Sequence, residues 1–219
     1  WTYDDAQVNS ATGPYRPGTA NAGYLARRGV DWDSKSQELH LSNGTESSVH
    51  WLVGVFWYNE ERQDYTNLVD IRRGSFPPIL YDPAREVTNR AVFGRIEWDF
   101  VDAWTLGVEG RYAEDELEFA LATGPVEREF DSFAPRVSVT WRVSDDVTPY
   151  ASYALGTRPG GINTALFAPT VPATERERLS GFIEIDEEEA DNYELGVKAW
   201  LLERRVYAEL TVFEIDWDK

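Results

Sequence analysis

Six carboxylates between residues 184 and 191 form the densest group of side chains that could do chemistry: Glu184, Asp186, Glu187, Glu188, Glu189 and Asp191. Hard divalent cations prefer clustered carboxylates, so a cation bridging this segment to a neighbouring loop or to lipopolysaccharide is one interpretation. The other is a solvated loop whose like charges repel one another, which is the usual state of a run of one sign. The sequence alone favours the solvated loop.

Other groups that catalysis or tight metal binding needs are almost missing from the sequence. Cysteine is absent, which removes disulfides, thiolate metal sites and cysteine nucleophiles. His40 and His50 are the only histidines, and their spacing fits no metal-ligand motif. No nucleophile-elbow signature appears, and paired carboxylates for glycoside chemistry need a measured separation. We therefore predict that the chain is not an enzyme and has no catalytic residue, cofactor or metal.

The charge and aromatic content narrow the class of protein. Lys and Arg number 21 against 39 Asp and Glu, a net charge of -18, which argues against binding nucleic acid or an anionic cytoplasmic membrane face. No apolar run approaches the roughly 20 residues that a membrane helix needs. Aromatic residues nevertheless reach 14%. A membrane β-barrel reconciles these facts, because only alternate residues of its strands face lipid.

Apolar and polar residues alternate with period two in several segments, which is typical of a strand with one apolar face. We predict that the apolar members face lipid: Val92, Ile96, Trp98, Leu106, Val108, Val137, Val139, Trp141, Leu195 and Val197. A charge on that face costs roughly 2–4 kcal/mol near the membrane midplane, so charged members should point into the lumen, toward a plug or lumen water. These are Arg95, Glu97, Glu109, Arg111, Arg136, Arg142, Glu194 and Lys198.

The links between these segments alternate in length. Short links lie at 43–46, 101–103, 144–146 and 203–205, and long stretches lie at 60–86, 118–131 and 159–189. An antiparallel up-and-down barrel with tight turns on one side and long loops on the other has this pattern, whereas Greek-key crossings would scramble it. We predict an all-β fold with about eight strands between residues 34 and 217. Residues 1–33 should be a preceding loop, and the register of the doubly apolar segment 49–58 cannot be read.

Several segments also resemble barrel strands of the TonB-dependent receptor family, in the order in which the family has them. Examples are S-Q-E-L-H-L-S (36–42), W-L-V-G-V-F-W-Y (51–58), N-R-A-V-F-G-R-I-E-W-D-F (89–100) and W-T-L-G-V-E-G-R-Y (104–112). F-A-P-R-V-S-V-T-W (133–141) follows, and the most specific pair is R-P-G-G-I-N (158–163) before N-Y-E-L-G-V-K (192–198). The resemblance covers most of residues 34–217.

The resemblance implies a transmembrane barrel of about 22 strands in the bacterial outer membrane, closed by an N-terminal plug. It also implies energy-coupled uptake of a bulky nutrient such as a ferric siderophore, driven by the TonB complex through the plug, among outer-membrane lipid and lipopolysaccharide. The sequence contains no plug segment, TonB box or closing aromatic strand, so residues 1–219 are expected to form a partial barrel. The corner at Arg158, Gly160, Gly161 and Asn163 would lie near the extracellular mouth, where it either meets an anionic ligand or only turns the chain.

Two alternatives remain open at this stage. One is an open porin-like channel, which an upstream plug sequence would distinguish from a receptor. The other is a soluble extracellular β-rich module that binds carbohydrate through its aromatic residues, which should purify without detergent. Loops select the ligand and vary freely, so the sequence does not identify it.

Overall fold

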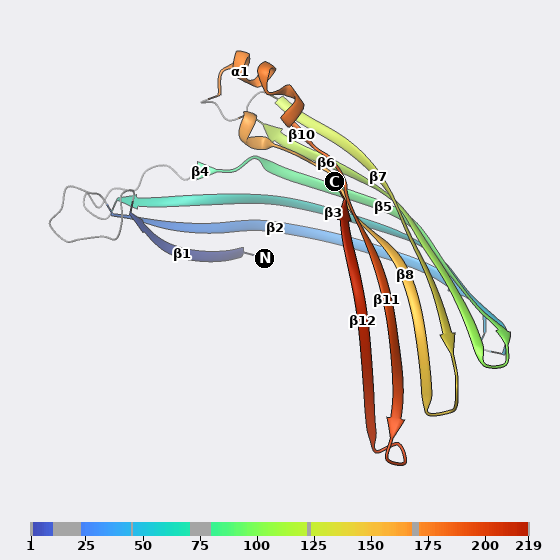
Figure 1. The fold of residues 1–219 in the computed structure, drawn as a ribbon. Helices are drawn as coiled ribbons and strands as arrows, with labels where there is room; N and C mark the ends of the chain where they lie inside the picture. Colours follow the sequence, from blue (N-terminus) through green and yellow to red (C-terminus); the bar gives the residue numbers. More distant parts are fainter. Residues whose placement is uncertain are drawn as a thin grey trace.

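Long antiparallel strands carry nearly the whole chain in the computed structural model, which describes residues 2–10, 23–44, 46–70, 80–121, 124–167 and 171–218 (Figure 1). The strands form one sheet in the order β1-β2-β3-β5-β6-β7-β8-β11-β12, with β4 paired to β3. Each long strand pairs with the one before it, so the prediction of an antiparallel up-and-down all-β fold is confirmed. Their bounds are Thr2–Ser10 (β1), Gly23–Ser42 (β2), Val49–Asp70 (β3), Leu80–Tyr81 (β4), Ala84–Val101 (β5), Trp104–Leu121 (β6), Gly124–Trp141 (β7), Val147–Arg158 (β8), Glu188–Leu201 (β11) and Val206–Asp218 (β12).

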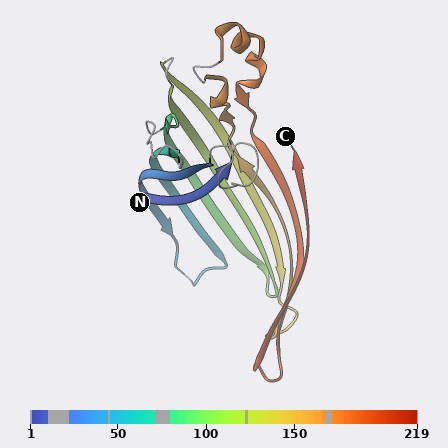
Figure 2. The ribbon, with the colours of Figure 1, turned by 90° about the vertical axis from the view of Figure 1, so that its left-hand side faces the viewer.

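The sheet is curved like a section of a barrel wall and does not close on itself (Figures 1 and 2). Its two edges are β1 and β12, which have no strand partner on their outer sides within the described part of the chain. A complete barrel has no free edges. The partial barrel expected from the sequence is therefore what the chain forms.

The predicted short links are confirmed, and they lie together at the lower right of the sheet in Figure 1. In the first of them, the Asn43 side chain donates to the Val49 carbonyl at 2.6 Å and accepts from the Trp51 amide at 2.8 Å. Asparagine suits a tight turn because its side chain mimics a backbone turn. In the last, Leu202, Glu203 and Arg204 all have positive φ (51°, 58° and 66°), a conformation that is uncommon outside glycine.

The expected boundaries fail at the opposite ends of the strands. Residues 1–33 were predicted to be a loop, but β1 and the first part of β2 are strands; residues 1 and 11–22 lie outside the described residues. The long loop predicted at 118–131 is also wrong, because β6 runs to Leu121 and β7 begins at Gly124, whose φ of 117° favours glycine. The alternation continues here with its polarity reversed: Glu116, Glu118 and Glu127 lie on the face that is apolar in 104–112, and Leu117, Phe119 and Val126 lie on the other. A membrane strand is not recognised from this pattern, although the backbone pairing continues.

The segment between β8 and β11 has structure of its own. Gly161–Ile162 (β9) pairs with Glu184–Ile185 (β10), and between them lie the 3₁₀ turns Thr164–Phe167 and Ser180–Phe182 and the helix Ala173–Arg178 (α1). Among the described residues, no helix is long and apolar enough to span a membrane. We call residues 159–187 the β8–β11 segment.

Candidate functional site

One face of the sheet carries a continuous apolar belt. The register places Trp98 opposite Leu106, Leu106 opposite Val139, and Val139 opposite Ala151, and the row continues to Leu195 on β11. All ten residues predicted to face lipid lie on this face. The register of 49–58 is now clear as well, with Trp51, Val53, Val55 and Trp57 on the belt face.

The belt is uncovered although it is apolar. Leu195 is 65% exposed and Val92 is 53% exposed. On β6 the belt runs over nine residues, Trp104–Tyr112, which is the length a tilted membrane strand needs, about 9–11 residues. An exposed patch of this extent marks a surface that meets something apolar.

Aromatic residues border the belt on both sides. On the short-turn side Trp104 stacks on Trp141 with ring centroids 5.1 Å apart. On the other side Tyr112 lies opposite Phe133, and Tyr153 and Tyr193, whose ring centroids are 5.2 Å apart, lie two belt rows nearer the middle, in the row of Val137. Amphipathic rings gather where hydrocarbon gives way to water, so the two borders have the composition of interfacial girdles.

The opposite face holds charged residues at the level of the belt. Arg95 contacts Glu97 and lies 3.5 Å from Glu109, and Glu109 lies opposite Arg136. On β11, Lys198 lies 3.7 Å from Glu209. Seven of the eight residues predicted to line the lumen share this face, which we call the inner face: Arg95, Glu97, Glu109, Arg111, Arg136, Glu194 and Lys198. The eighth, Arg142, lies one residue beyond β7 in an exposed turn, so the register does not fix it on that face.

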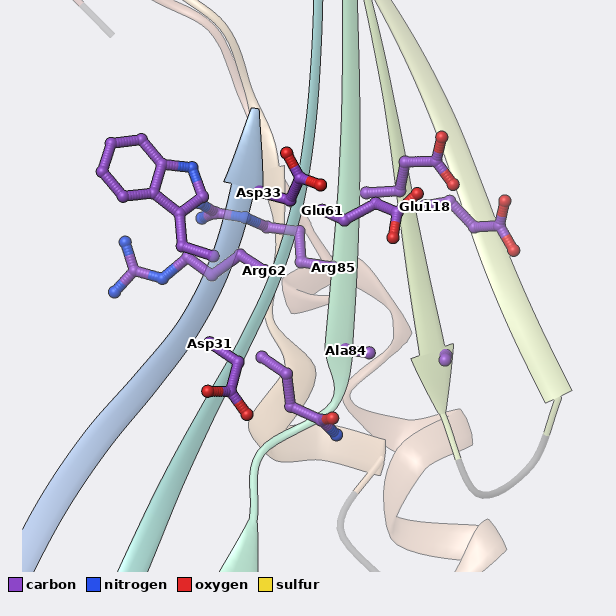
Figure 3. A pocket seen from close by; sticks show the side chains of 11 residues that line it. Asp31, Asp33, Glu61, Arg62, Ala84, Arg85 and Glu118 are labelled. Carbon is purple, nitrogen blue, oxygen red and sulfur yellow. The ribbon is translucent and has the colours of Figure 1, made fainter. Parts of the chain in front are cut away.

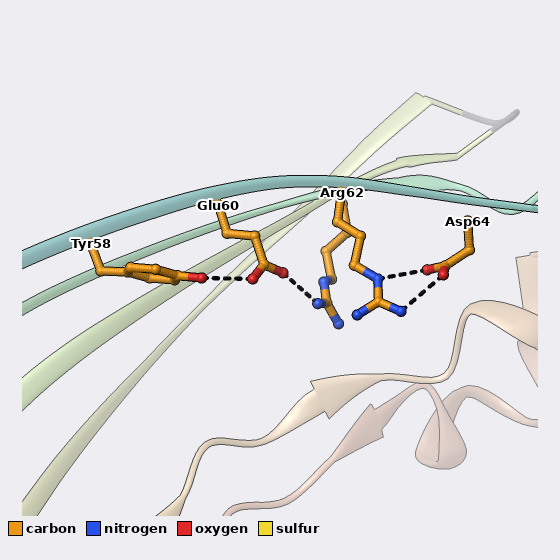
Figure 4. Close-up of polar contacts among 5 residues, drawn as sticks. Tyr58, Glu60, Arg62 and Asp64 are labelled. Carbon is orange, nitrogen blue, oxygen red and sulfur yellow. Dashed lines mark hydrogen bonds and ion pairs between the residues drawn. The ribbon is translucent and has the colours of Figure 1, made fainter. Parts of the chain in front are cut away.

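Beyond the belt, toward the long-link end, the inner face carries a polar network that the sequence did not predict (Figure 4). Tyr58 donates to Glu60 at 2.7 Å, and Arg85 donates to the other carboxylate oxygen of Glu60 at 2.7 Å. Arg62 makes a two-pronged pair with Asp64, at 2.8 and 2.9 Å. These residues continue the alternation of β3 past Trp57, a signal that was hidden because the register of 49–58 could not be read.

The ion pairs of this network shift the acidities of their carboxyl groups. Arg62 holds the pKa of Asp64 below its usual range, chiefly through its hydrogen bonds, against the opposing effect of burial. Burial raises the pKa of Glu60, but the bonds from Tyr58 and Arg85 outweigh it and lower the pKa overall. Both carboxylates are therefore held in the charged form. A hollow of about 400 Å³ adjoins the Arg62–Asp64 pair and also touches Arg28 and Asp82.

We expect Asp64→Asn to destabilise the folded protein at neutral pH but not in acid. Because the folded pKa of Asp64 is lowered, its stabilising effect is present above the ordinary aspartate pKa of about 3.9 and is lost as pH falls through the folded value. The side chain is 41% exposed, so the difference should be about 1 kcal/mol or less. Unfolding of variant and native protein at pH 7 and pH 3 measures it, and a difference that stays constant with pH would contradict the assignment.

The β8–β11 segment packs onto the inner face beside this network. Arg128 on β7 donates to Glu184 at 2.6 Å, and Gly160 is buried against the Phe130 ring and the Ile185 carbonyl. Phe130 lies in the row that continues through Asp115 and Asn89 to Tyr58. The segment and the network therefore border the same opening at the long-link end of the inner face, which we call the mouth.

The four residues predicted to bind ligand lie together where this segment begins. Arg158 pairs with Glu188 at 3.1 Å and is 73% exposed at its side chain. Gly161 pairs with Ile185 in the two-stranded β9–β10 sheet, and the Asn163 amide donates to the Ile183 carbonyl at 2.8 Å. Together with the packed Gly160, these contacts shape the corner. Of the four, Arg158 presents an exposed charged group.

The same strand ends carry mainly carboxylates on their other face. One row crosses five strands with carboxylates directly opposite one another: Asp33, Glu61, Glu86, Glu118 and Glu127. Like charges opposite each other destabilise a sheet. Their crowding shows at Glu127, whose pKa is raised by a hydrogen bond to Glu116 and by repulsion from neighbouring carboxylates.

A hollow of about 550 Å³ lies over these strand ends (Figure 3). Its lining includes Asp33, Glu61 and Glu118 together with Arg62 and Arg85. Arg62 and Arg85 are each bound to one carboxylate of the inner-face network. The carboxylate row on the other face has an excess of negative charge. Outside the belt, the inner face therefore carries ion pairs of both signs, and the other face carries an excess of negative charge.

The chain that forms this site matches a known protein family. The family model described as "TonB dependent receptor-like, beta-barrel" matches residues 1–219. The chain belongs to this family. Membership removes the soluble carbohydrate-binding module from the alternatives, because the family consists of outer-membrane receptor barrels.

Solved receptor structures have the same fold. The ferric yersiniabactin uptake receptor FyuA from Yersinia pestis matches 88% of this chain with a TM-score of 0.66 and 17% identity, over 30% of its own length. BauA, the ferric preacinetobactin receptor from Acinetobacter baumannii, matches 98% with a TM-score of 0.69 and 17% identity, over 33% of its length. The ferric-catecholate import receptor Fiu from E. coli K12 matches 99% with a TM-score of 0.62 and 15% identity, over 36% of its length. The chain thus spans about a third of the length of these solved receptor chains.

Proposed function

We propose that this chain forms part of the wall of an outer-membrane receptor that imports a bulky anionic ligand such as a ferric siderophore. The observation that carries the proposal is the group of four arginines at the mouth. Arg62, Arg85, Arg128 and Arg158 lie on or border the inner face, each held by a single carboxylate partner, while the carboxylate row lies on the other face. Arginine binds anionic oxygens through charge-assisted, two-pronged hydrogen bonds, so an anionic ligand can take the place of these partners.

The rest of the receptor supplies the coupling. In this proposal the belt meets membrane lipid and lipopolysaccharide, and the charged ladder of Arg95, Glu97 and Glu109 faces a plug domain. The TonB complex acts through that plug to drive import. The similar solved structures are named as receptors for ferric yersiniabactin and ferric preacinetobactin, which supports iron chelates as the ligand class.

Uptake by the full-length receptor carrying Arg62→Gln and Arg85→Gln tests the proposal. Radiolabelled ferric siderophores of negative and neutral net charge are the probes. Removing two charge-assisted contacts should weaken binding of the anionic probe by about tenfold or more and leave the neutral probe nearly unchanged. Arg204→Gln, in the turn at the far end of the sheet, is the matched control and should not alter uptake of either probe.

Equal uptake of the anionic probe by the double variant and the native receptor would contradict the proposal. Passive entry of small solutes without energy coupling would instead favour the open porin-like channel. The two outcomes are separable, because a porin discriminates little between the probes and does not need the TonB complex.

A further inference from the structure

The alternation of β12 reverses its polarity where the strand leaves the apolar belt. On the belt face, Val212 lies opposite Leu195, but the next residues of that face are the carboxylates Glu214, Asp216 and Asp218. The inner face of the same stretch carries Phe213, Ile215 and Trp217, which we call the aromatic stripe. This stretch lies at the end of the sheet where the β8–β11 segment lies (Figure 2). The aromatic stripe therefore faces the mouth.

The aromatic stripe is uncovered, unlike the inner face of β7 at the mouth. On β7, the Phe130 ring packs against Gly160 of the β8–β11 segment. Phe213 and Trp217 are exposed. A strand paired to the free edge of β12 would lie beside these rings and not over them, because side chains stand roughly perpendicular to a sheet. Exposed apolar side chains of this size mark a surface that meets a partner, and here the partner must lie inside the mouth.

The inner face beside the stripe is almost free of side chains. Trp217 lies opposite Ala190, and Ala190 lies opposite Gly156. Gly156 is exposed, and among the described residues a Cβ there would meet only the Ala190 carbonyl oxygen, at 3.8 Å. A flat group can therefore lie against Trp217 over the backbone of β11 and β8.

An arginine without an ion-pair partner lies on the far side of this bare part of the sheet. Arg136 on β7 lies opposite Ala154, so no large side chain separates it from the bare part. Its other neighbour, Glu109, is contacted by Arg95 at 3.5 Å, and Arg136 makes no ion pair within the part of the chain that the structure describes. Three strand spacings, about 14 Å along the sheet, separate Arg136 from β12. That separation gives room for a metal chelate with several rings.

We propose that the mouth receives an iron chelate whose metal-binding groups are aromatic, that is, a catecholate. One ring stacks on Trp217 over Gly156, and an ionised oxygen of the chelate pairs with Arg136. Aromatic rings gain energy from offset stacking beyond the area they bury, and arginine binds anionic oxygens through charge-assisted hydrogen bonds. A chelate built from aliphatic groups would pair with the arginine but leave the stripe in water. The inference rests on the proposed function and narrows its class of ligand.

Binding of two anionic iron complexes to the full-length receptor tests the inference. The probes are a ferric tris-catecholate and ferric citrate, which has no ring, both labelled with radioactive iron. The native receptor should bind the catecholate more tightly by about tenfold or more. Phe213→Leu combined with Trp217→Leu keeps the stripe apolar but removes both rings, so catecholate binding should weaken by about tenfold and citrate binding should stay nearly unchanged. Gly156→Leu, which fills the bare part of the sheet, should weaken catecholate binding to a similar extent.

Two matched variants serve as controls. Trp217→Phe retains a ring and should keep most of the affinity for the catecholate. Tyr207→Leu removes a ring from the same face of β12 at its other end, where Tyr207 lies 5.1 Å from Trp200, and should alter binding of neither probe. Heat-modifiable mobility of each variant checks that the barrel has assembled.

Equal binding of both complexes by the native receptor would overturn the inference. So would native-like catecholate binding by the double stripe variant, or an equal loss in Tyr207→Leu. A loss of both complexes in the stripe variant would show that another part of the receptor covers the stripe, which also overturns it. Arg62→Gln combined with Arg85→Gln should weaken both anionic complexes alike, so failure of the proposed function is distinguishable from failure of this inference.

Discussion

Val139→Arg is expected to block assembly of the barrel. Val139 lies in the middle of the apolar belt, opposite Leu106 on one side and Ala151 on the other. A guanidinium at the membrane midplane costs roughly 2–4 kcal/mol, and no carboxylate on that face lies within reach to offset it. The measurement is the fraction of full-length receptor that shows heat-modifiable mobility in the outer membrane, which should fall severalfold.

Arg142→Ala provides the control from the same part of the chain. Arg142 lies one residue past the end of β7 and is exposed, so its loss should leave the assembled fraction almost unchanged. If both variants assemble equally well, the belt does not face hydrocarbon.

Gly160→Val is expected to release the β8–β11 segment from the mouth. A Cβ at Gly160 would overlap the Ile185 carbonyl oxygen and the Phe130 ring, and the carbonyl belongs to the backbone of β10 and cannot swing away. Overpacking of this kind typically costs about 1–3 kcal/mol. The Arg128–Glu184 pair, at 2.6 Å, should separate with the segment. We expect rapid proteolysis between residues 171 and 187 and about tenfold weaker binding of an anionic ferric siderophore.

Gly161→Ala is the matched control one residue away. A Cβ there meets only the Ile185 methyl at 3.9 Å, an ordinary contact. Protease resistance and ligand affinity should therefore match the native receptor. Resistance that survives in Gly160→Val would show that the segment does not depend on this close approach.

Period-two alternation predicts the membrane part of the fold well, because there each strand has one face in hydrocarbon and one in water. The segment 104–112 illustrates this, since its apolar residues occupy the belt and Glu109 and Arg111 occupy the inner face. The tight turns were also predictable, because Asn43 and the Asp-rich links carry turn chemistry. The turn at Leu202–Arg204 is different. Nothing in its residue types indicates the left-handed backbone that the structure has there.

The strand ends beyond the belt could not be delimited from the sequence. The link predicted at 118–131 follows a run of acidic residues at 114–118, but the strands pair as far as Leu121 and again from Gly124. The inner-face network could not be predicted either. Arg85 and Glu60 are 25 residues apart and meet only because β3 and β5 are neighbours, a relation that no local pattern contains. Gly160 was predicted near the mouth, but its packing against Phe130 depends on how the β8–β11 segment folds back.

Solvent accessibility along β7 shows directly whether one face of this sheet meets hydrocarbon and the other meets water. The chain has no cysteine, so a spin label can be placed at single positions in this segment. Labels at Val137, Val139 and Trp141 of the full-length receptor in lipid bilayers should collide mainly with dissolved oxygen. Labels at Ser138 and Thr140 should collide mainly with a water-soluble nickel chelate. If the belt faces hydrocarbon, accessibility alternates from one residue to the next in this order; equal accessibilities, or the reverse order, would contradict that placement.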